Sequence, residues 1–424
     1  MPLMVLAVLL CLTAAADAEV LVRWDQVPVP SRESLGIDVL VVPAQNAGAL
    51  QSALRQGYRV YVEVDASNLA TVPLPAEGLA GIVVRGSPAA PQLLQLEGRL
   101  KSRAVRVLTL DERGKWPHIR TNWVTRNNEV LQVSGRTAQP WIENNAALAR
   151  IIELARKDRT SASFITYSWT PITLSEQDEG PGLANYLVAI SEAGSFGLNL
   201  VLPLHERFQR NLLLGIPQAR SDWKAIRSHL EFYAWDLPNR YERIANIGVV
   251  LSEPIRWYEV LNLLSRHNLP FEIIPTGDLP GRRLEGLKLL LVLDAAAADA
   301  DTLTGFERAG GLVRRVDAVA DPNAFALEVR KILGPEHRVI DIWNGITVLA
   351  APFREPDGNN LLVTALNYAH EPLPIQMRVP GTFSTISYES PDDGFSLLPF
   401  EHRDGHTEFV LPALATGARV FLSR

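Results

Sequence analysis

The stretches RVYVEVD at residues 59–65 and GIVVRG at residues 81–86 decide how this sequence is expected to fold. Both are short runs rich in β-branched apolar residues, which favour buried strands. Similar runs recur at 20–24, 38–43, 105–112, 130–135, 162–169 and 198–206, and stretches typical of helices separate most of them. Apolar strands that alternate with helices predict a parallel sheet covered on both faces. Eight such units favour closure into a (β/α)8 TIM barrel, with an open doubly wound sheet as the alternative.

The sixth run has a second interpretation. The stretch IRTNWVTRNNEVLQV at residues 119–133 can also form a hairpin that turns at Asn127 and Asn128, because paired asparagines between two apolar arms are typical of tight turns. Only its second arm, which continues to residue 135, is assigned to the barrel.

The pattern changes twice beyond the barrel. ANIGVVLSE at 245–253 opens a second alternation of strands and helices, which predicts a small Rossmann-like α/β domain without a glycine-rich nucleotide motif. From about residue 338 alternating strands take over, and Asp357-Gly358 and Pro380-Gly381 mark turns between them. We therefore expect a barrel with a linking helix at 19–240, an α/β domain at 241–335 and an antiparallel β-sandwich at 336–424.

The first eighteen residues resemble an export signal. An apolar run is followed by small residues ending at Ala18, which predicts cleavage before Glu19 and an exported mature chain. The run is shorter than the roughly 20 apolar residues that span a bilayer. Lipid attachment at Cys11 is the alternative, although Leu10 stands before it where a small residue is usual.

Composition narrows the range of partners and cofactors. The formal charge of −6 over 424 residues provides no basic stripe, so no nucleic-acid partner is expected. The single cysteine lies in the export signal, which excludes thiolate metal sites and cysteine nucleophiles from the mature chain. His118 and His205 lack the spacing of metal ligands. No nucleotide, metal or other cofactor is expected.

The order of the parts resembles the glycoside hydrolases of the family 42 β-galactosidase kind. The closest local similarities are IANIGVVLSEPIRWYEVLNLLSRHNLPFEIIP in the second part, and NNLLVTALNYAHEPLPIQMRVPG with HTEFVLPALATGARVFL in the third. The resemblance covers nearly the whole mature chain. It implies an amidotransferase-like middle domain concerned with trimerisation, hence a homo-oligomer. The alternative is that the predicted helix at 222–236 packs within one chain.

The resemblance does not carry over to the catalytic residues. The family places an Asn-Glu acid/base after strand 4 and a glutamate nucleophile after strand 7. This chain has Arg85-Gly86 and Tyr167-Ser168-Trp169 at those strand ends. The family's catalytic glutamates therefore do not transfer, and any chemistry must be sought among other residues.

Candidate site residues were chosen at the C-terminal ends of the predicted barrel strands, where barrel enzymes place their active sites. Glycoside cleavage needs two carboxyl groups flanking the bond, and sugars bind to aromatic faces edged by polar groups. The catalytic candidates are Glu206, Glu143, Asp111 and Glu112. The candidates for substrate binding are Trp24, Asp25, Asp65, Arg85, Arg136, Gln139, Trp141, Tyr167, Trp169 and His205, and Glu63 is a further acid at the end of the third strand.

The four acidic candidates also have structural interpretations or limits. Glu206 can pair with Arg207 or Arg210 in a loop. Glu143 can favour the positive end of a helix that opens at PWIENN. Because neighbouring strand residues alternate, only one of Asp111 and Glu112 is expected to face the mouth of the barrel.

Two functional hypotheses follow. The first is an exported glycoside hydrolase that acts on an oligosaccharide or polysaccharide through carboxylates at the barrel mouth. The second is a non-catalytic carbohydrate-binding or scaffold protein on a barrel that lacks a catalytic pair. Converging arginines at the mouth would favour an acidic sugar.

Overall fold

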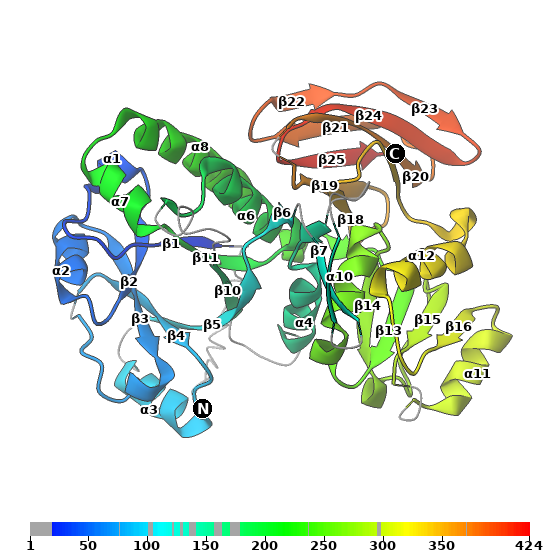
Figure 1. The fold of residues 1–424 in the computed structure, drawn as a ribbon, viewed down its shortest axis with the longest axis horizontal. Helices are drawn as coiled ribbons and strands as arrows, with labels where there is room; N and C mark the ends of the chain where they lie inside the picture. Colours follow the sequence, from blue (N-terminus) through cyan, green and yellow to red (C-terminus); the bar gives the residue numbers. More distant parts are fainter. Residues whose placement is uncertain are drawn as a thin grey trace, which may run out of the picture.

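The computed structural model describes residues 19–75, 77–100, 105–120, 123–127, 130–134, 141–156, 163–169, 179–235, 237–294, 298–369 and 371–424. Figure 1 shows three parts: a barrel on the left, an α/β unit on the right, and a β-sandwich above them. The architecture expected from the sequence, a closed parallel barrel followed by α/β and antiparallel β parts, is confirmed.

Seven parallel strands close the barrel in the order β1-β11-β10-β5-β4-β3-β2. They are β1 (Val20–Arg23), β2 (Val39–Pro43), β3 (Arg59–Asp65), β4 (Leu79–Arg85), β5 (Arg106–Lys115), β10 (Ser163–Ser168) and β11 (Asn199–Pro203). The helices of this part are α1 (Arg32–Leu35), α2 (Ala47–Arg55), α3 (Ala90–Leu100), α4 (Ala146–Arg156), α6 (Leu183–Phe196), α7 (Glu206–Leu213) and α8 (Pro217–Tyr233), with the 3-10 turn η1 (Ala66–Asn68).

The barrel differs from the expected eight strands at the sixth run. β8 (Val130–Ser134) pairs antiparallel with β7 (Trp123–Asn127), so this segment forms the hairpin that was the alternative. A second short pair joins β6 (His118–Arg120) to β9 (Trp141–Glu143). β10 pairs directly with β5, with Ser163 opposite Thr109, and the ring closes without the sixth run.

The α/β unit has a four-stranded parallel sheet in the order β14-β13-β15-β16. Its strands are β13 (Ile247–Leu251), β14 (Phe271–Pro275), β15 (Leu289–Val292) and β16 (Leu312–Arg315). Its helices are α10 (Tyr258–Arg266), α11 (Ala300–Arg308) and α12 (Pro322–Leu333), with the 3-10 turns η2 (Pro254–Trp257), η3 (Thr276–Asp278) and η5 (Pro335–His337). Asp321 caps α12 by accepting hydrogen bonds from the first-turn amides, and Pro322 follows at the first helical position. Separate apolar clusters pack on the two faces of this sheet.

The β-sandwich contains a six-stranded sheet, β12-β18-β19-β25-β21-β22, and a four-stranded sheet, β17-β20-β24-β23. The first is built from β12 (Glu242–Arg243), β18 (Val348–Arg354), β19 (Leu361–Asn367), β25 (Gly417–Ser423), β21 (Thr385–Ser390) and β22 (Gly394–Leu397). The second is built from β17 (Asp341–Trp343), β20 (Leu373–Pro380), β24 (His406–Leu414) and β23 (Phe400–Arg403). A short helix, α9 (Leu237–Arg240), precedes β12, which therefore pairs with the sandwich although it comes before the α/β unit.

Polar and aromatic contacts join the three parts. The guanidinium of Arg419, in the sandwich, lies 3.8 Å from the ring of Phe232 and 3.9 Å from the ring of Trp235, just after α8. Asp341 accepts hydrogen bonds from arginines of both the α/β unit and the sandwich, Arg330 at 2.8 Å and Arg378 at 2.8 Å. The parts are therefore held together by specific pairs as well as by apolar packing.

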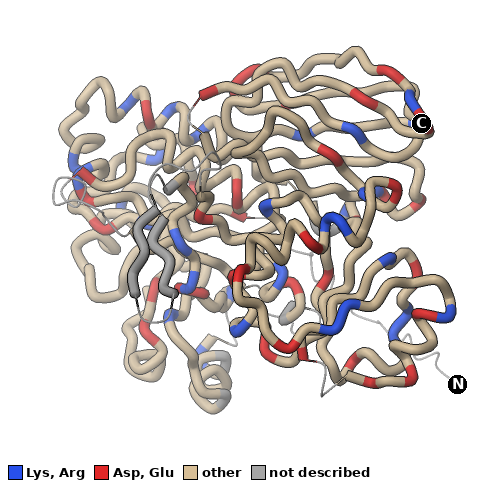
Figure 2. Tube along the Cα trace, turned by 45° about the vertical axis from the view of Figure 1, so that its right-hand side comes forward, with Lys and Arg blue, Asp and Glu red and all other residues tan. Residues whose placement is uncertain are grey.

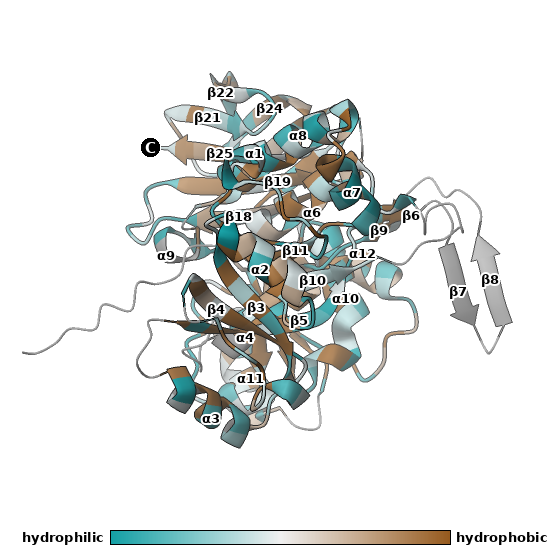
Figure 3. Cartoon of the chain, turned by 90° about the vertical axis from the view of Figure 1, so that its left-hand side faces the viewer, coloured by the Kyte–Doolittle hydropathy of each residue, from teal (hydrophilic) through white to brown (hydrophobic). Residues whose placement is uncertain are grey.

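Hydropathy and charge follow this arrangement. Hydrophobic residues colour the barrel strands β3 and β4 in Figure 3, whereas α7 on the outside is mostly hydrophilic. Figure 2 shows Lys and Arg interspersed with Asp and Glu over the described part of the trace. In the part of the chain that the structure describes, no helix is long and apolar enough to cross a membrane.

Candidate functional site

A layer of charged side chains lies at the C-terminal end of the barrel. Leu21, Tyr61, Val83 and Leu110 belong to one apolar cluster of the strands. Side chains two positions further along a strand point the same way, and these positions hold Arg23, Glu63, Arg85 and Glu112. Because side chains on each of these four strands alternate in direction, the charged side chains form a layer directly above the apolar layer. We call Arg23, Asp25, Glu63, Asp65, Arg85 and Glu112 the mouth cluster.

Glu63 is the centre of the mouth cluster, and its side chain is only 2% exposed. Its Oε2 accepts a hydrogen bond of 2.8 Å from Nε of Arg23, and its Oε1 lies 3.6 Å from Nη1 of Arg85. Arg85 Nε in turn donates to Oε1 of Glu112 at 2.9 Å. Arg23 Nη1 donates to Oδ2 of Asp25 at 2.8 Å. Acids and guanidiniums thus alternate across the barrel mouth.

The arginines of the cluster are held firmly in the charged form. The hydrogen bond with Glu112, followed by the charges of Glu112, Glu63 and Asp65, raises the pKa of Arg85 above its ordinary value against the opposing effect of burial. Burial alone would lower the pKa of Arg23, but the hydrogen bonds and charges of Glu63 and Asp25 outweigh it and raise the pKa. Both guanidiniums are fixed cations at this site.

The cluster also brings two carboxylates into reach of one another. Glu63 and Glu112 contact the same guanidinium, with Arg85 Nη2 at 2.5 Å from Oε1 of Glu112. The two carboxylates therefore lie on opposite terminal nitrogens of one guanidinium. Glu112 is 39% exposed and accessible to a ligand, whereas Glu63 is buried beneath the arginines.

The position of residues at the C-terminal ends of the predicted strands predicts part of this cluster. Asp25, Asp65, Arg85 and Glu112 were expected at the mouth, and the structure brings them together around Arg85 and Arg23. The sequence also indicates Glu63 as an acid at the end of its strand, but does not indicate Arg23. The two-residue periodicity of RVYVEVD places Glu63 on the same face as Tyr61, and that signal supports its position at the mouth.

The last barrel strand leads to residues outside the mouth cluster. His205 caps α7, and its Nδ1 accepts a hydrogen bond of 3.3 Å from the amide of Arg207. Glu206 lies in the first turn of α7, is 59% exposed and pairs with Arg210 one turn later. The structure therefore shows Glu206 as an exposed acid on the surface of α7, outside the mouth cluster.

Three aromatic candidates belong to the core. Trp24 is fully buried and donates its indole N–H to the carbonyl of Gln26 at 2.8 Å. Tyr167 is 3% exposed and packs edge-on against Trp116. Trp169 is partly buried against the same cluster and also packs edge-on against Trp116. Trp24 and Tyr167 have no surface open to a sugar, because their rings fill space between strands and helices.

Three further candidates face other neighbours. Asp111 accepts a hydrogen bond of 2.9 Å from Nε of Arg113, so Glu112 is the member of that pair that reaches Arg85. Glu143 is buried in β9, and Oε1 lies 3.1 Å from Nζ of Lys115. The ring of Trp141 lies under the guanidinium of Arg266 and packs against the α/β unit. Glu143 and Asp111 are therefore each paired with a cation outside the mouth cluster. Arg136 and Gln139 lie outside the described residues.

A second buried carboxylate lies where all three parts meet. Glu192 of α6 is fully buried and accepts hydrogen bonds from four neutral donors. These are the Tyr368 hydroxyl at 2.7 Å, the Tyr167 hydroxyl at 3.0 Å, and the side-chain and backbone N–H groups of Asn145 at 2.6 and 2.9 Å. Burial raises the pKa of Glu192 to about 7, although all four hydrogen bonds oppose that shift. Sequence reasoning missed this residue, since it lies in the middle of a helix.

The described side chains contain no group of three or more His, Cys, Asp or Glu residues arranged to hold a metal ion. The mouth cluster itself contains arginines between its carboxylates, which is unfavourable for a cation.

Comparison with solved structures finds a chain of similar fold. α-L-Fucosidase isoenzyme 2 from Paenibacillus thiaminolyticus matches with a TM-score of 0.61 at 8% sequence identity, over 96% of this chain and 100% of that one. At such low identity the similarity shows the fold alone.

The matches also include glycoside hydrolases of family 42, the kind that the sequence resembles. An exo-carrageenase of that family from Bacteroides ovatus has a TM-score of 0.40 at 11% identity, over 90% of this chain and 54% of that one. A β-galactosidase from Rahnella sp. has a TM-score of 0.45 at 8% identity, over 94% and 99% of the two chains. At these scores neither adds to the argument. No family model matches the sequence. No curated protein matches it either.

Proposed function

We propose that this chain is a carbohydrate-active protein of the glycoside hydrolase type, and that it binds a saccharide at the mouth cluster. The observation that carries the proposal is the shared contact of Glu63 and Glu112 with Arg85 at the C-terminal end of a closed barrel. Barrel enzymes place their chemistry at that end. The glycosidase fold of the structural neighbour supports the same class.

The two carboxylates have different roles in this proposal. Glu112, partly exposed, is the group that reaches the glycosidic oxygen or the attacking water. Glu63, buried and held by two guanidiniums, is the fixed carboxylate that positions Arg23 and Arg85, and through Arg85 also Glu112. Arg23 and Arg85 orient these acids and also attract an acidic sugar, because guanidinium groups pair readily with carboxylates.

The test is a screen of the mature protein against aryl glycosides and polysaccharides, including uronate-containing ones, for release of reducing ends. We expect turnover of at least one substrate and a loss of about 100-fold or more in kcat for Glu112→Gln and for Glu63→Gln. Glu206→Gln is the matched control, because Glu206 is an exposed acid paired with Arg210 outside the cluster. Turnover that survives both mouth substitutions would refute the assignment.

A non-catalytic carbohydrate-binding protein is the second candidate, and one observation favours it. Asp25, Glu63 and Glu112 each form an ion pair with an arginine of the cluster. Such ion pairs keep the acids ionised, which suits binding of a polar ligand better than it suits proton transfer. This candidate predicts saccharide binding that Arg85→Gln weakens, with no reducing ends released from any substrate.

Export of the mature chain is also part of the proposal, and its support is the apolar leader that ends at Ala18. The measurement is N-terminal sequencing of protein recovered outside the cytoplasm. A mature chain that begins at Glu19 supports export, and a chain that keeps residues 1–18 contradicts it.

A further inference from the structure

A buried glutamine connects helix α7 to the mouth of the barrel. Gln209 is the buried residue of α7, and its exposed fraction is 0%. The buried positions of a helix on the surface of a protein are usually apolar. A polar side chain at such a position is kept there by its hydrogen bonds, which show what it holds in place.

Gln209 uses both ends of its side-chain amide. Its Oε1 accepts hydrogen bonds from the backbone N–H groups of Asp25 at 3.0 Å and Gln26 at 3.2 Å. Its Nε2 donates to the carbonyl of Leu204, just after β11, at 2.7 Å. Only an amide has both the acceptor and the donor that these contacts need. This side chain therefore joins the loop after β1 to the chain after β11.

The loop after β1 is held at further points. Asn46, the N-cap residue of α2, donates its side-chain N–H to the carbonyl of Asp25 at 2.5 Å. The indole N–H of the buried Trp24 donates to the carbonyl of Gln26 at 2.8 Å. Both backbone polar groups of Asp25 are thus fixed by side chains of α7 and α2. The position of Asp25 is therefore set before any ligand arrives.

The side chain of Asp25 keeps one oxygen for a ligand. It is 31% exposed, and its Oδ2 accepts a hydrogen bond of 2.8 Å from Nη1 of Arg23. Within the described chain, Oδ1 accepts a long hydrogen bond of 3.4 Å from Nε2 of Gln26. Because each carboxylate oxygen has two lone pairs, Oδ1 has room for a further donor.

The order of the strands places Asp25 across the mouth from Glu112. In the closed ring, β11 and β10 lie between β1 and β5 on one side, and β2, β3 and β4 lie between them on the other. Asp25 follows β1, and Glu112, which is 39% exposed, belongs to β5. Two partly exposed carboxylates therefore come from opposite sides of the ring.

We propose that Asp25 determines which sugar the mouth accepts, by accepting a hydrogen bond from one ligand hydroxyl, and that Gln209 is a positioning residue that acts through Asp25. This inference rests on the proposed saccharide site. A hydroxyl forms a strong hydrogen bond with an ionised carboxylate. A sugar without that hydroxyl is rejected, because it leaves the acceptor unpaired.

The experiment is isothermal titration of the full mature chain with galactose, L-fucose, glucose and glucuronate. The sugar that binds most tightly is then compared with its monodeoxy analogues. We expect removal of one hydroxyl to weaken binding to the wild type by about tenfold or more. In Asp25→Ala, where Arg23 still pairs with Glu63, removal of the same hydroxyl should have little effect. Asp25→Asn repeats the test with the size of the side chain preserved.

Gln209→Met tests the positioning role. Methionine has a similar size but forms none of the three hydrogen bonds of Gln209. This variant should lose most of the discrimination between the sugar and its deoxy analogue. Because Gln209 acts through Asp25, the double variant with Asp25→Ala should show no further loss.

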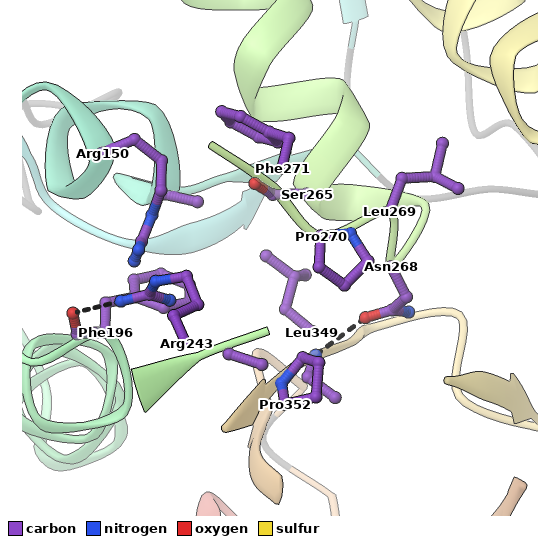
Figure 4. Close-up of a pocket in the computed structure, with 13 residues that line it drawn as sticks. Arg150, Phe196, Arg243, Ser265, Asn268, Leu269, Pro270, Phe271, Leu349 and Pro352 are labelled. Carbon is purple, nitrogen blue, oxygen red and sulfur yellow. Dashed lines mark hydrogen bonds between the residues drawn. The ribbon is translucent and has the colours of Figure 1, made fainter. Parts of the chain in front are cut away.

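The amino end of the barrel provides a matched control. Asn199, the first residue of β11, is also a buried amide at 4% exposure, and its Oδ1 accepts a hydrogen bond of 3.0 Å from the backbone N–H of Glu19. Figure 4 shows a cavity near this end, where Arg243 donates to the carbonyl of Phe196 at the end of α6. Asn199→Leu should therefore reduce stability, as Gln209→Met does, but leave the discrimination between sugars unchanged.

The outcomes separate this inference from the proposed function. Binding that Arg85→Gln weakens, but that shows the same discrimination in the wild type, Asp25→Ala and Asp25→Asn, overturns the inference and leaves the saccharide site standing. Binding of none of the four sugars overturns the inference, and a negative screen for turnover then removes the proposed function as well. If Asn199→Leu loses the discrimination to the same extent as Gln209→Met, the loss reflects stability and Gln209 has no positioning role.

Discussion

Glu63 and Glu192 are two glutamates buried to nearly the same extent, at 2% and 0% exposure, in opposite surroundings. Glu63 lies at the barrel mouth between the guanidiniums of Arg23 and Arg85. Glu192 lies at the junction of the three parts, where the described residues that donate hydrogen bonds to it are tyrosine hydroxyls and asparagine N–H groups. One carboxylate is balanced by full positive charges and the other by neutral dipoles.

The difference shows that the partners of a buried acid, more than its depth, decide what it can do. Guanidinium partners compensate for the loss of water around a charge and fix that charge in place. Neutral donors compensate less, so burial raises the pKa of Glu192 to about 7. The mouth is therefore suited to recognising a polar ligand, whereas the junction holds a proton near neutral pH.

The largest expected effect comes from removing Glu63. Glu63→Leu preserves the approximate size of the side chain but leaves Arg23 and Arg85 without their shared acceptor. Loss of one partner from a buried pair typically costs about 3 kcal/mol or more. We expect a matching fall in the free energy of unfolding of the barrel, measured by denaturant titration with fluorescence of the buried Trp24 and Trp116.

The control for that measurement is Glu112→Gln. Glu112 binds the same arginine, but its side chain is 39% exposed, and exposed ion pairs contribute less than about 1 kcal/mol. If Glu63→Leu is no less stable than Glu112→Gln, then Glu63 is not the buried centre of the cluster.

A smaller effect with a distinct pH dependence is expected at Glu192. Its raised pKa means that the folded protein holds the proton more tightly than the unfolded chain does. The resulting stability is complete below the ordinary pKa of 4.5 and is lost as the pH rises to about 7. Glu192→Gln cannot ionise, so it should gain stability relative to wild type over that interval, by up to about 3 kcal/mol. Unfolding curves of both proteins at a series of pH values measure this difference.

Two tyrosine variants test whether the hydrogen bonds to Glu192 set the pH interval over which it affects stability. Tyr368→Phe removes a donor that lowers the pKa of Glu192, so the pH interval of the effect should shift upward. Tyr388→Phe removes a hydroxyl in the sandwich that hydrogen-bonds Asp393 at 3.3 Å, and it should leave the interval unchanged. Parallel stability profiles for wild type and Glu192→Gln would show that Glu192 does not titrate in this range.

The two sites differ in how far the sequence could predict them. Strand ends and two-residue alternation are local properties, so the sequence alone predicts Asp25, Arg85 and Glu112 at the mouth. The same local reasoning counted the run at 130–135 as a barrel strand, because an apolar run does not say which neighbour it pairs with. The irregular pairing of β5 and β10 between Ile165 and Tyr167 is equally invisible to a pattern of alternation.

The junction network could not be predicted locally. Glu192 lies 47 positions from Asn145 and 176 positions from Tyr368. Their meeting depends on how the barrel helix α6 packs against the sandwich, and no periodicity in α6 marks one glutamate as different. A buried acid of this kind is recognisable only once the relative positions of the three parts are known.

The smallest change in stability is expected when Glu206 is replaced. Glu206 adds a solvent-exposed carboxylate to the comparison of the two buried ones. Its side chain is 59% exposed, and its partner Arg210 lies one turn further along α7. Solvent screens such a pair and both side chains lose conformational freedom in forming it, so its contribution is a few tenths of a kcal/mol. Glu206→Gln should therefore change the midpoint of thermal unfolding by less than that of Glu63→Leu or Glu192→Gln at any pH. Arg210→Gln removes the other half of the pair and should be equally mild. A large loss of stability in either variant would mean that α7 stabilises the barrel mouth through this ion pair. The differences between Glu63, Glu192 and Glu206 would then not be explained by their ion-pair partners, neutral hydrogen-bond donors and solvent, respectively.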